Sequence, residues 1–153
     1  MTFLSLAIAS ALGVGYVPFA PGTFGSAVGL LVWALLPASP AVHAVTIIAM
    51  LVIGSFAGNV AERHFKRSDP RQVVLDEVMG MLITLFMVPV GWFGAAIGFV
   101  LFRAADVVKP FPANRLERLH GGLGVMADDA MAAVYANLAL RLVMLALGNR
   151  VIW

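Results

Sequence analysis

Five acidic and two basic side chains gather in three short segments of a chain that is otherwise rich in apolar residues. They are Asp76 and Glu77, then Arg103, Asp106 and Lys109, then Asp128 and Asp129. Carboxylate oxygens are preferred ligands of hard divalent cations, and Arg and Lys side chains bind phosphate. Charged groups beside long apolar segments are costly to keep there, which makes them candidates for function. If the segments meet in space, the sequence predicts one site for a divalent cation and a phosphate group.

Some of these groups also have a structural interpretation. Asp128 opens a predicted helix, where acidic side chains commonly cap backbone N–H groups, so capping is an equal alternative for it. Arg103 and Asp106 share a helix face at i, i+3 spacing and could form a structural ion pair. His43 lies in an apolar segment without an acidic neighbour and is interpreted as structural. The sequence assigns no role to Arg141.

The composition is that of an integral membrane protein. Hydrophobic residues make up 61% of the chain and charged residues only 12%, against about a quarter in soluble proteins. Residues 1–61 contain no Asp, Glu, Lys or Arg, and the four basic residues between 63 and 71 are too few to indicate nucleic acid as a partner. The absence of Cys excludes cysteine-dependent phosphatases. We expect one domain, residues 1–153, embedded in the bilayer.

The first part of the chain contains three apolar runs. Residues 3–20 begin without the basic residues of a signal peptide and predict a mature first helix. Residues 24–36 would span only about 20 Å as a helix, less than the hydrocarbon core, whereas residues 41–60 are long enough to cross it. Thr23 is the expected N-cap of the second helix. The basic residues of the loop at 61–75 place that loop on the cytoplasmic side.

A helical hairpin is predicted within the next apolar stretch. Residues 78–102 could make a single crossing, but Pro89 and Gly91 interrupt them near the centre. Basic residues follow at both ends, which favours two arms, 76–88 and 92–106, that return to one side. Non-helical backbone at such depth must be covered by protein. The turn of this hairpin is therefore expected inside the bundle.

The last predicted helix runs from about 128 to 147, after a glycine-rich turn at 121–124. Small residues that favour tight helix packing are Gly80, Ala132, Ala133 and Ala136. The predicted fold is all-α: a polytopic membrane bundle with short or broken helices and a re-entrant-like hairpin. Its charged site lies at the cytoplasmic face.

Four segments together carry a family resemblance. They are Pro-Gly-Thr-Phe-Gly-Ser at 21–26, Val-Leu-Asp-Glu-Val-Met-Gly at 74–80, Phe-Arg-Ala-Ala-Asp-Val-Val-Lys-Pro-Phe-Pro at 102–112, and Gly-Val-Met-Ala-Asp-Asp at 124–129. In this order and combination they resemble the phosphatidylglycerophosphatase A family of bacterial inner-membrane lipid phosphatases. The family often has Trp where Phe24 and Phe111 stand here.

The resemblance implies magnesium-dependent removal of the terminal phosphate from phosphatidylglycerophosphate, which gives phosphatidylglycerol and inorganic phosphate. It also implies a multi-pass protein of the bacterial cytoplasmic membrane with its active site facing the cytoplasm. The residues are assigned as follows: Asp76, Glu77 and Asp129 to Mg²⁺; Arg103, Lys109 and Thr23 to the phosphate; Asp106, Asp128 and Lys109 to catalysis. Which acid binds metal and which acts as base or supports the ligands stays open, as do direct water attack against a covalent intermediate, and the oligomeric state.

An alternative function is a small channel or transporter subunit whose acidic cluster coordinates an ion. Other lipid enzymes fit less well. The chain lacks the spaced aspartates of CDP-alcohol phosphotransferases and the Pro-Ser-Gly-His segment of histidine-dependent lipid phosphatases. Phosphate release or ion flux by the purified protein would separate the two alternatives.

Overall fold

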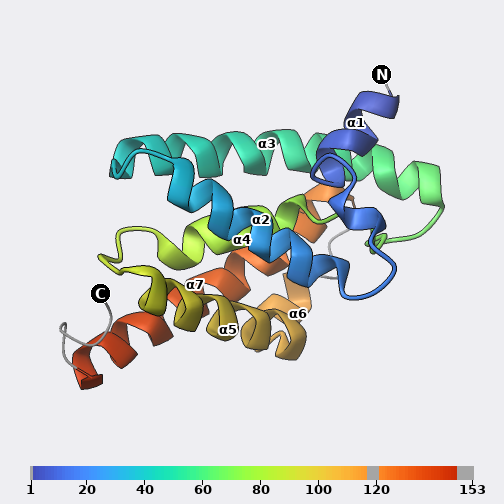
Figure 1. Ribbon diagram of the computed structural model, residues 1–153. Coiled ribbons are helices and arrows are strands. Elements are labelled where there is room, and N and C mark those ends of the chain that lie inside the picture. Colours follow the sequence, from blue (N-terminus) through green and yellow to red (C-terminus); the bar gives the residue numbers. More distant parts are fainter. Residues whose placement is uncertain (1, 117–120, 148–153) are drawn as a thin grey trace.

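A computed structural model describes residues 2–116 and 121–147, and every regular element among them is a helix (Figure 1). The elements are α1 (Thr2–Ala9), the short 3-10 helix η1 (Val14–Tyr16), α2 (Pro21–Leu35), α3 (Pro40–Phe65), α4 (Leu75–Leu85), α5 (Trp92–Val108), α6 (Ala113–Leu116) and α7 (Gly122–Leu147). The prediction of an all-α fold is confirmed.

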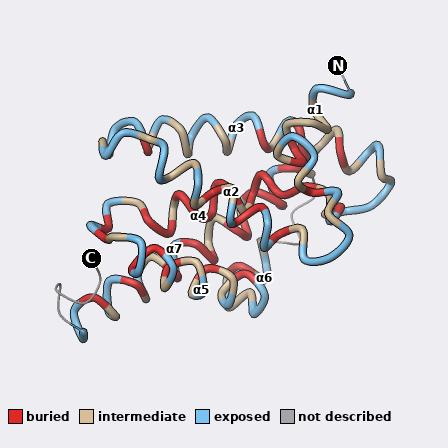
Figure 2. Tube along the Cα trace, in the orientation of Figure 1, coloured by how far each residue is buried: buried red, intermediate tan, exposed pale blue. Residues whose placement is uncertain are grey.

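Helix α4 forms the centre of the bundle. Apolar and small residues occupy nearly all of its positions, so it has no polar face to offer to solvent and is buried over most of its length (Figure 2). It packs against α2, α3, α5 and α7. The acidic residues Asp76 and Glu77 stand at the start of this central helix.

The predicted helical hairpin is present, but its turn does not lie wholly inside the bundle, because Met87 and Pro89 are exposed. Helix α4 ends at Leu85, α5 begins at Trp92, and residues 86–91 between them contain the interrupting Pro89 and Gly91. In Figure 1, α2, α4 and α7 run from right to left, whereas α3 and α5 run back. As a result, the start of α4, the end of α5 and the start of α7 lie at the same end of the molecule.

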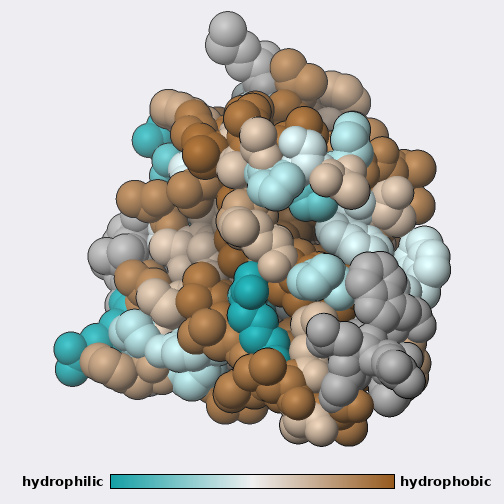
Figure 3. Space-filling model, turned by 90° about the vertical axis from the view of Figure 1, so that its left-hand side faces the viewer, coloured by the Kyte–Doolittle hydropathy of each residue, from teal (hydrophilic) through white to brown (hydrophobic). Residues whose placement is uncertain are grey.

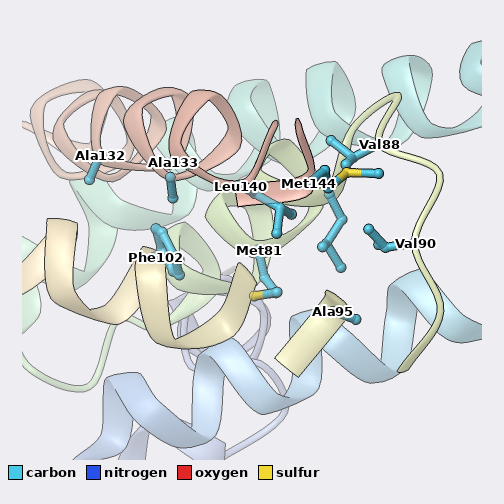
Figure 4. Packing of buried hydrophobic residues seen from close by; sticks show 11 residues of the cluster. Met81, Val88, Val90, Ala95, Phe102, Ala132, Ala133, Leu140 and Met144 are labelled. Carbon is cyan, nitrogen blue, oxygen red and sulfur yellow. The ribbon is translucent and has the colours of Figure 1, made fainter. Parts of the chain in front are cut away.

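Small residues allow the close packing of α4, α5 and α7. A Cβ atom at Gly80 would collide with the ring of Phe102, which fills this face of α4 from α5. Figure 4 shows Phe102 beside Ala133 of α7 within the main hydrophobic cluster. Ala132, Ala133 and Ala136 are almost fully buried. The predicted packing role of these small residues is confirmed.

Two described helices, α3 and α7, are long and apolar enough to cross a membrane by length and composition. Helix α3 keeps much of one side exposed, as the pale blue stretches in Figure 2 show. Large apolar side chains on that side are 36% to 71% exposed: Val42, Val45, Ile48, Val52, Ile53 and Phe56. A contiguous apolar face of this kind marks contact with another apolar phase or partner.

The sequence prediction placed the start of the last helix too late. Helix α7 begins at Gly122 rather than near 128, so Gly122 and Gly124 lie within the helix and only Gly121, with φ 89°, stays outside it. A Cβ atom at Gly122 would collide with the carbonyl oxygen of Ser55 on α3. The side chain of Asn59 on α3 accepts a hydrogen bond of 3.0 Å from the Gly122 N–H. This bond satisfies one of the N–H groups left open where a helix begins.

The predicted N-cap at Thr23 is also wrong. Helix α2 begins two residues earlier, at Pro21, and its N-cap position is Ala20. Proline suits the first helical turn because its φ angle is already helical and its missing N–H needs no partner there. Thr23 therefore lies within the first turn, where its side chain is exposed.

Candidate metal and phosphate site

Three carboxylates from two helices form the centre of the site. Asp76 and Glu77 come from the first turn of α4, and Asp129 comes from the second turn of α7. One ligand oxygen from each lies within 4.8 Å of the other two. These are the three residues that the sequence analysis assigned to a divalent cation, and the fold brings them together.

The cluster contains acceptor atoms without partners. Among the described residues, Glu77 Oε2 and Asp129 Oδ2 are buried and accept no hydrogen bond. One oxygen of Asp76 accepts from the backbone N–H of Glu77 at 3.1 Å. Buried ionised oxygens are costly unless a cation or donor compensates them. Their number and proximity fit a divalent cation with oxygen ligands.

Asp76 and Glu77 stand in the first turn of α4, which is not one of the two long apolar helices, and their surroundings shift their pKa values. Burial raises the pKa of Asp76 well above its usual value, and the nearby carboxylates of Glu77 and Asp129 raise it further. Burial also raises the pKa of Glu77. Both effects disfavour the charged forms, and a bound cation would act in the opposite direction.

Arg103 stands beside the cluster at the end of α5. Its Nη1 lies 2.7 Å from Asp106 Oδ2 and 3.9 Å from Glu77 Oε1. The same atom donates a 3.5 Å hydrogen bond to the buried hydroxyl of Ser26 on α2. The ion pair with Asp106 that sequence spacing suggested is therefore present. It also holds the guanidinium next to a carboxylate of the central cluster.

Lys109 and Asp128 form a second ion pair at the edge of the cluster. Asp128 lies in the second turn of α7 and is buried, so it does not cap that helix. Its other oxygen accepts from the backbone N–H of Asp129 at 2.9 Å. The capping alternative for Asp128 is thus wrong, because the helix begins six residues earlier. Both Arg103 and Lys109 are therefore ion-paired with carboxylates of the site.

All seven predicted charged residues line one cavity of about 340 Å³. Ala20, Pro21 and Gly22 form part of its wall, whereas Thr23 is not among its lining residues. A Cβ atom at Gly22 would collide with Glu77 Oε1 and lie 3.2 Å from Arg103 Nη1. The backbone of α2 therefore approaches the charged side chains at Gly22. The residue that faces the site from this segment is Gly22 rather than Thr23.

Asp69 and Arg71 also line this cavity, and sequence reasoning did not assign them to the site. Both belong to the connection between α3 and α4, which had been interpreted only as a basic cytoplasmic loop. Asp69 adopts a left-handed backbone conformation with φ 48°, and its N–H donates to Glu62 Oε1 at 3.3 Å. The only sequence signal for either residue is its nearness to Asp76.

A larger cavity, about 670 Å³, lies at the other end of the molecule. Its lining is mostly apolar and contains no carboxylate; Trp33, His43 and Trp92 are among its residues. Figure 3 shows this end as largely brown and tan, with scattered hydrophilic patches. His43 is buried there, and its Nε2 has no hydrogen-bond partner among the described residues. Of these two cavities, only the smaller one is lined by carboxylates.

A family model and two of the related proteins found by comparison carry the same family name. A family model described as Phosphatidylglycerophosphatase A matches residues 7–144. A Bacteroides thetaiotaomicron protein, whose name proposes a phosphatidylinositol-3-phosphatase, is 38% identical over 88% of this chain and 90% of its own length. The Escherichia coli protein named phosphatidylglycerophosphatase A is 35% identical over 83% of this chain and 76% of its own length. The Haemophilus influenzae protein of the same name is 33% identical over 84% of this chain and 82% of its own length. No solved structure matches the chain.

Proposed function

Because the chain belongs to the phosphatidylglycerophosphatase A family, we propose that it hydrolyses the terminal phosphate of phosphatidylglycerophosphate. The products are phosphatidylglycerol and inorganic phosphate. One observation carries this proposal: the seven charged residues expected from the sequence line a single cavity, and two buried carboxylate oxygens there have no hydrogen-bond partner among the described residues. A divalent cation would supply the positive charge that the carboxylates lack, and the cation together with Arg103 and Lys109 would bind the negative phosphate group.

The residues suit Mg²⁺, with Asp76, Glu77 and Asp129 as its ligands. They are oxygen donors only, they lie within 4.8 Å of one another, and Mg²⁺ binds through a few carboxylates while keeping several waters. When bound, the ion would neutralise phosphate charge and lower the pKa of a coordinated water. The unpartnered oxygens of Glu77 and Asp129 are the atoms that would gain most from it.

The two cations bind the phosphate group, and their carboxylate partners orient them. Asp106 holds Arg103 at 2.7 Å, and Asp128 pairs with Lys109. A guanidinium fixed in this way can offer further N–H groups to two phosphate oxygens at once. Asp106 and Asp128 are also the two candidates for accepting a proton from the attacking water.

The protein acts as a multi-pass protein of the bacterial cytoplasmic membrane, with the cavity facing the cytoplasm. Support comes from the exposed apolar side of α3, from the length of α3 and α7, and from the basic residues of the loop before α4. In this cysteine-free chain, single cysteines at Ser68 and Arg115 should both be shielded from an impermeant maleimide in spheroplasts and both react after lysis. Labelling of only one in intact spheroplasts would contradict a shared cytoplasmic face.

Phosphate release by the purified protein tests the reaction. We expect turnover of phosphatidylglycerophosphate with Mg²⁺, its loss in excess EDTA, and its return when Mg²⁺ is added back. Phosphatidylinositol 3-phosphate belongs in the same assay because the Bacteroides relative is named for it. Faster phosphate release from phosphatidylinositol 3-phosphate would identify that lipid as the better substrate. Full turnover in EDTA would exclude a required metal ion. Ion flux without turnover would favour the channel alternative.

A further inference from the structure

Helices α4 and α7 run in the same direction and touch at two levels, which are eight residues apart on each helix. At the first level, Asp76 and Glu77 lie against Asp129. At the second level, the Asn137 side chain bonds to the carbonyl of Thr84 at 2.9 Å. Both pairs, 76 with 129 and 84 with 137, have the same offset of 53 positions. The two helices are therefore fixed in one register at both levels.

The second level is a network of donors on α7 that bond to the end of α4. The Asn137 Nδ2 group lies 3.1, 2.9 and 3.0 Å from the carbonyl oxygens of Ile83, Thr84 and Phe86. Arg141 Nε donates to Asn137 Oδ1 at 2.9 Å and so fixes the orientation of the amide. Arg141 Nη2 bonds to the carbonyls of Phe86 and Met87 at 3.2 and 3.0 Å. We define Asn137 and Arg141 as the register clamp.

We propose that the register clamp positions the carboxylates of α4 against Asp129, so that Asn137 and Arg141 are positioning residues for the metal site. This inference rests on the proposed function. A helix rises about 1.5 Å per residue, whereas metal–ligand distances tolerate only about 0.2 Å. A slide of α4 by a fraction of one residue would therefore spoil the set of three carboxylates. Apolar packing on Gly80 and the alanines of α7 is not directional, but hydrogen bonds are.

The location of the clamp agrees with this role. Helix α4 is short, with 11 residues, and its last carbonyls lose their helical partners where residues 86–91 leave the helix. In an apolar environment those carbonyls need donors from elsewhere in the protein. Donors on α5 or α3 would also satisfy them, yet the structure takes both from α7, the helix that carries Asp129. The same bonds thus cap one helix and align two.

The test compares Asn137→Leu, which removes the donors at similar size, with Asn137→Gln, which retains an amide. Mn²⁺ serves as the probe, and its binding to the purified, substrate-free protein is measured by electron paramagnetic resonance. We expect Asn137→Leu to weaken Mn²⁺ binding about tenfold, as for other residues that support metal ligands, and Asn137→Gln to restore part of it. Leu140→Ala is the matched control, since it destabilises the same helix without touching the clamp, and its Mn²⁺ affinity should stay near that of the wild type.

A second measurement reports register without any metal. In the cysteine-free chain, Asp76→Cys with Asp129→Cys can be joined by a short bifunctional thiol reagent, and Asn137→Leu in this background should slow that reaction several-fold. Equal rates with and without Asn137→Leu would overturn the proposal, as would an equal loss of Mn²⁺ affinity in Leu140→Ala. If Asn137→Leu does not fold, Arg141→Met removes the outer half of the clamp and is expected to give a smaller loss in both measurements. Absence of Mn²⁺ binding by the wild type would reject the metal site, while the cross-linking rates would still decide the clamp.

Discussion

The oxygen acceptors at the two ends of the α4–α7 pair differ in whether they have hydrogen-bond partners. At the hairpin end, the carbonyls of residues 83 to 87 each accept a hydrogen bond, from Asn137, from Arg141 or from the backbone N–H of Val88. At the charged end, Glu77 Oε2 and Asp129 Oδ2 are buried and lack partners among the described residues. Leaving a buried acceptor unpaired costs about 1–3 kcal/mol, and more when the group is charged.

At the hairpin end of the helix pair, each of these oxygen atoms therefore has a hydrogen-bond donor. At the charged end, two buried carboxylate oxygens have none among the described residues. Helix α7 supplies a donor side chain at Asn137, eight residues after Asp129, where it meets the end of α4. The difference indicates that the charged end is built for a ligand that brings its own positive charge. Such local cost is characteristic of functional sites, where surrounding structure maintains an arrangement that would otherwise relax.

The largest effect is expected when one negative charge is removed from the charged end of the helix pair. Asp129→Asn keeps the size of the side chain but removes a metal ligand, so turnover of phosphatidylglycerophosphate should fall by at least about a hundredfold. Without metal, the melting temperature should stay equal or rise, because one buried negative charge next to Asp76 and Glu77 is gone. Phosphate release and thermal melting in detergent measure the two effects.

Glu62→Gln provides the matched control, since Glu62 bonds to Asp69 outside the cluster of three carboxylates. A loss of folding in Asp129→Asn with retained turnover in the folded fraction would show that Asp129 is a structural residue. That result would make the two ends of the helix pair equivalent, and the metal assignment would fail with it.

Sequence reasoning reached the charged residues of the site because their types are rare in this chain. The seven predicted residues line one cavity, and the hairpin follows from Pro89 and Gly91. Glycine was harder to interpret, because the same residue type marks turns and permits close helix contact. Only the contact of Gly122 with Ser55, on a helix more than sixty residues away, distinguishes the two roles.

The register clamp was also beyond the reach of sequence reasoning. Asn137 and Arg141 stand at i, i+4 spacing on an apolar helix, and their partners are backbone carbonyls about fifty positions earlier. Backbone carbonyls are present at every position and leave no mark in a sequence. For this reason the sequence analysis assigned no role to Arg141. In the structure, its side chain donates hydrogen bonds to the carbonyls of Phe86 and Met87.

A smaller effect is expected when the charge is kept and only its geometry is changed. Arg103→Lys retains the cation beside Asp106 but loses the planar group that can bind two phosphate oxygens. Charge-assisted hydrogen bonds contribute roughly 1.5–3 kcal/mol each, so turnover should fall about tenfold to a hundredfold while the protein stays folded. Phosphate release and size-exclusion chromatography check the two statements.

The double variant Arg103→Met with Asp106→Leu distinguishes a functional pair from a structural one. Replacing a buried ion pair by apolar residues is often neutral for stability, so this variant should fold and be inactive. Near-normal turnover in the double variant would remove both residues from the site. The active end would then be reduced to Asp76, Glu77, Asp128, Asp129 and Lys109.

The smallest effect is expected from a substitution at Thr23, which can be compared with the same substitution at the neighbouring Gly22. Sequence analysis assigned Thr23 to the phosphate, but its side chain is exposed and outside the lining of the cavity, whereas Gly22 lies against Glu77 and Arg103. Thr23→Ala should therefore change turnover by less than about twofold, as exposed substitutions change free energies by about 0.5 kcal/mol or less. Gly22→Ala is the matched variant, because the same methyl group one position earlier must displace the carboxylate of Glu77, and turnover should drop clearly. If instead Thr23→Ala slows phosphate release and Gly22→Ala does not, the hydroxyl reaches the phosphate and the wall of the cavity must move when substrate binds.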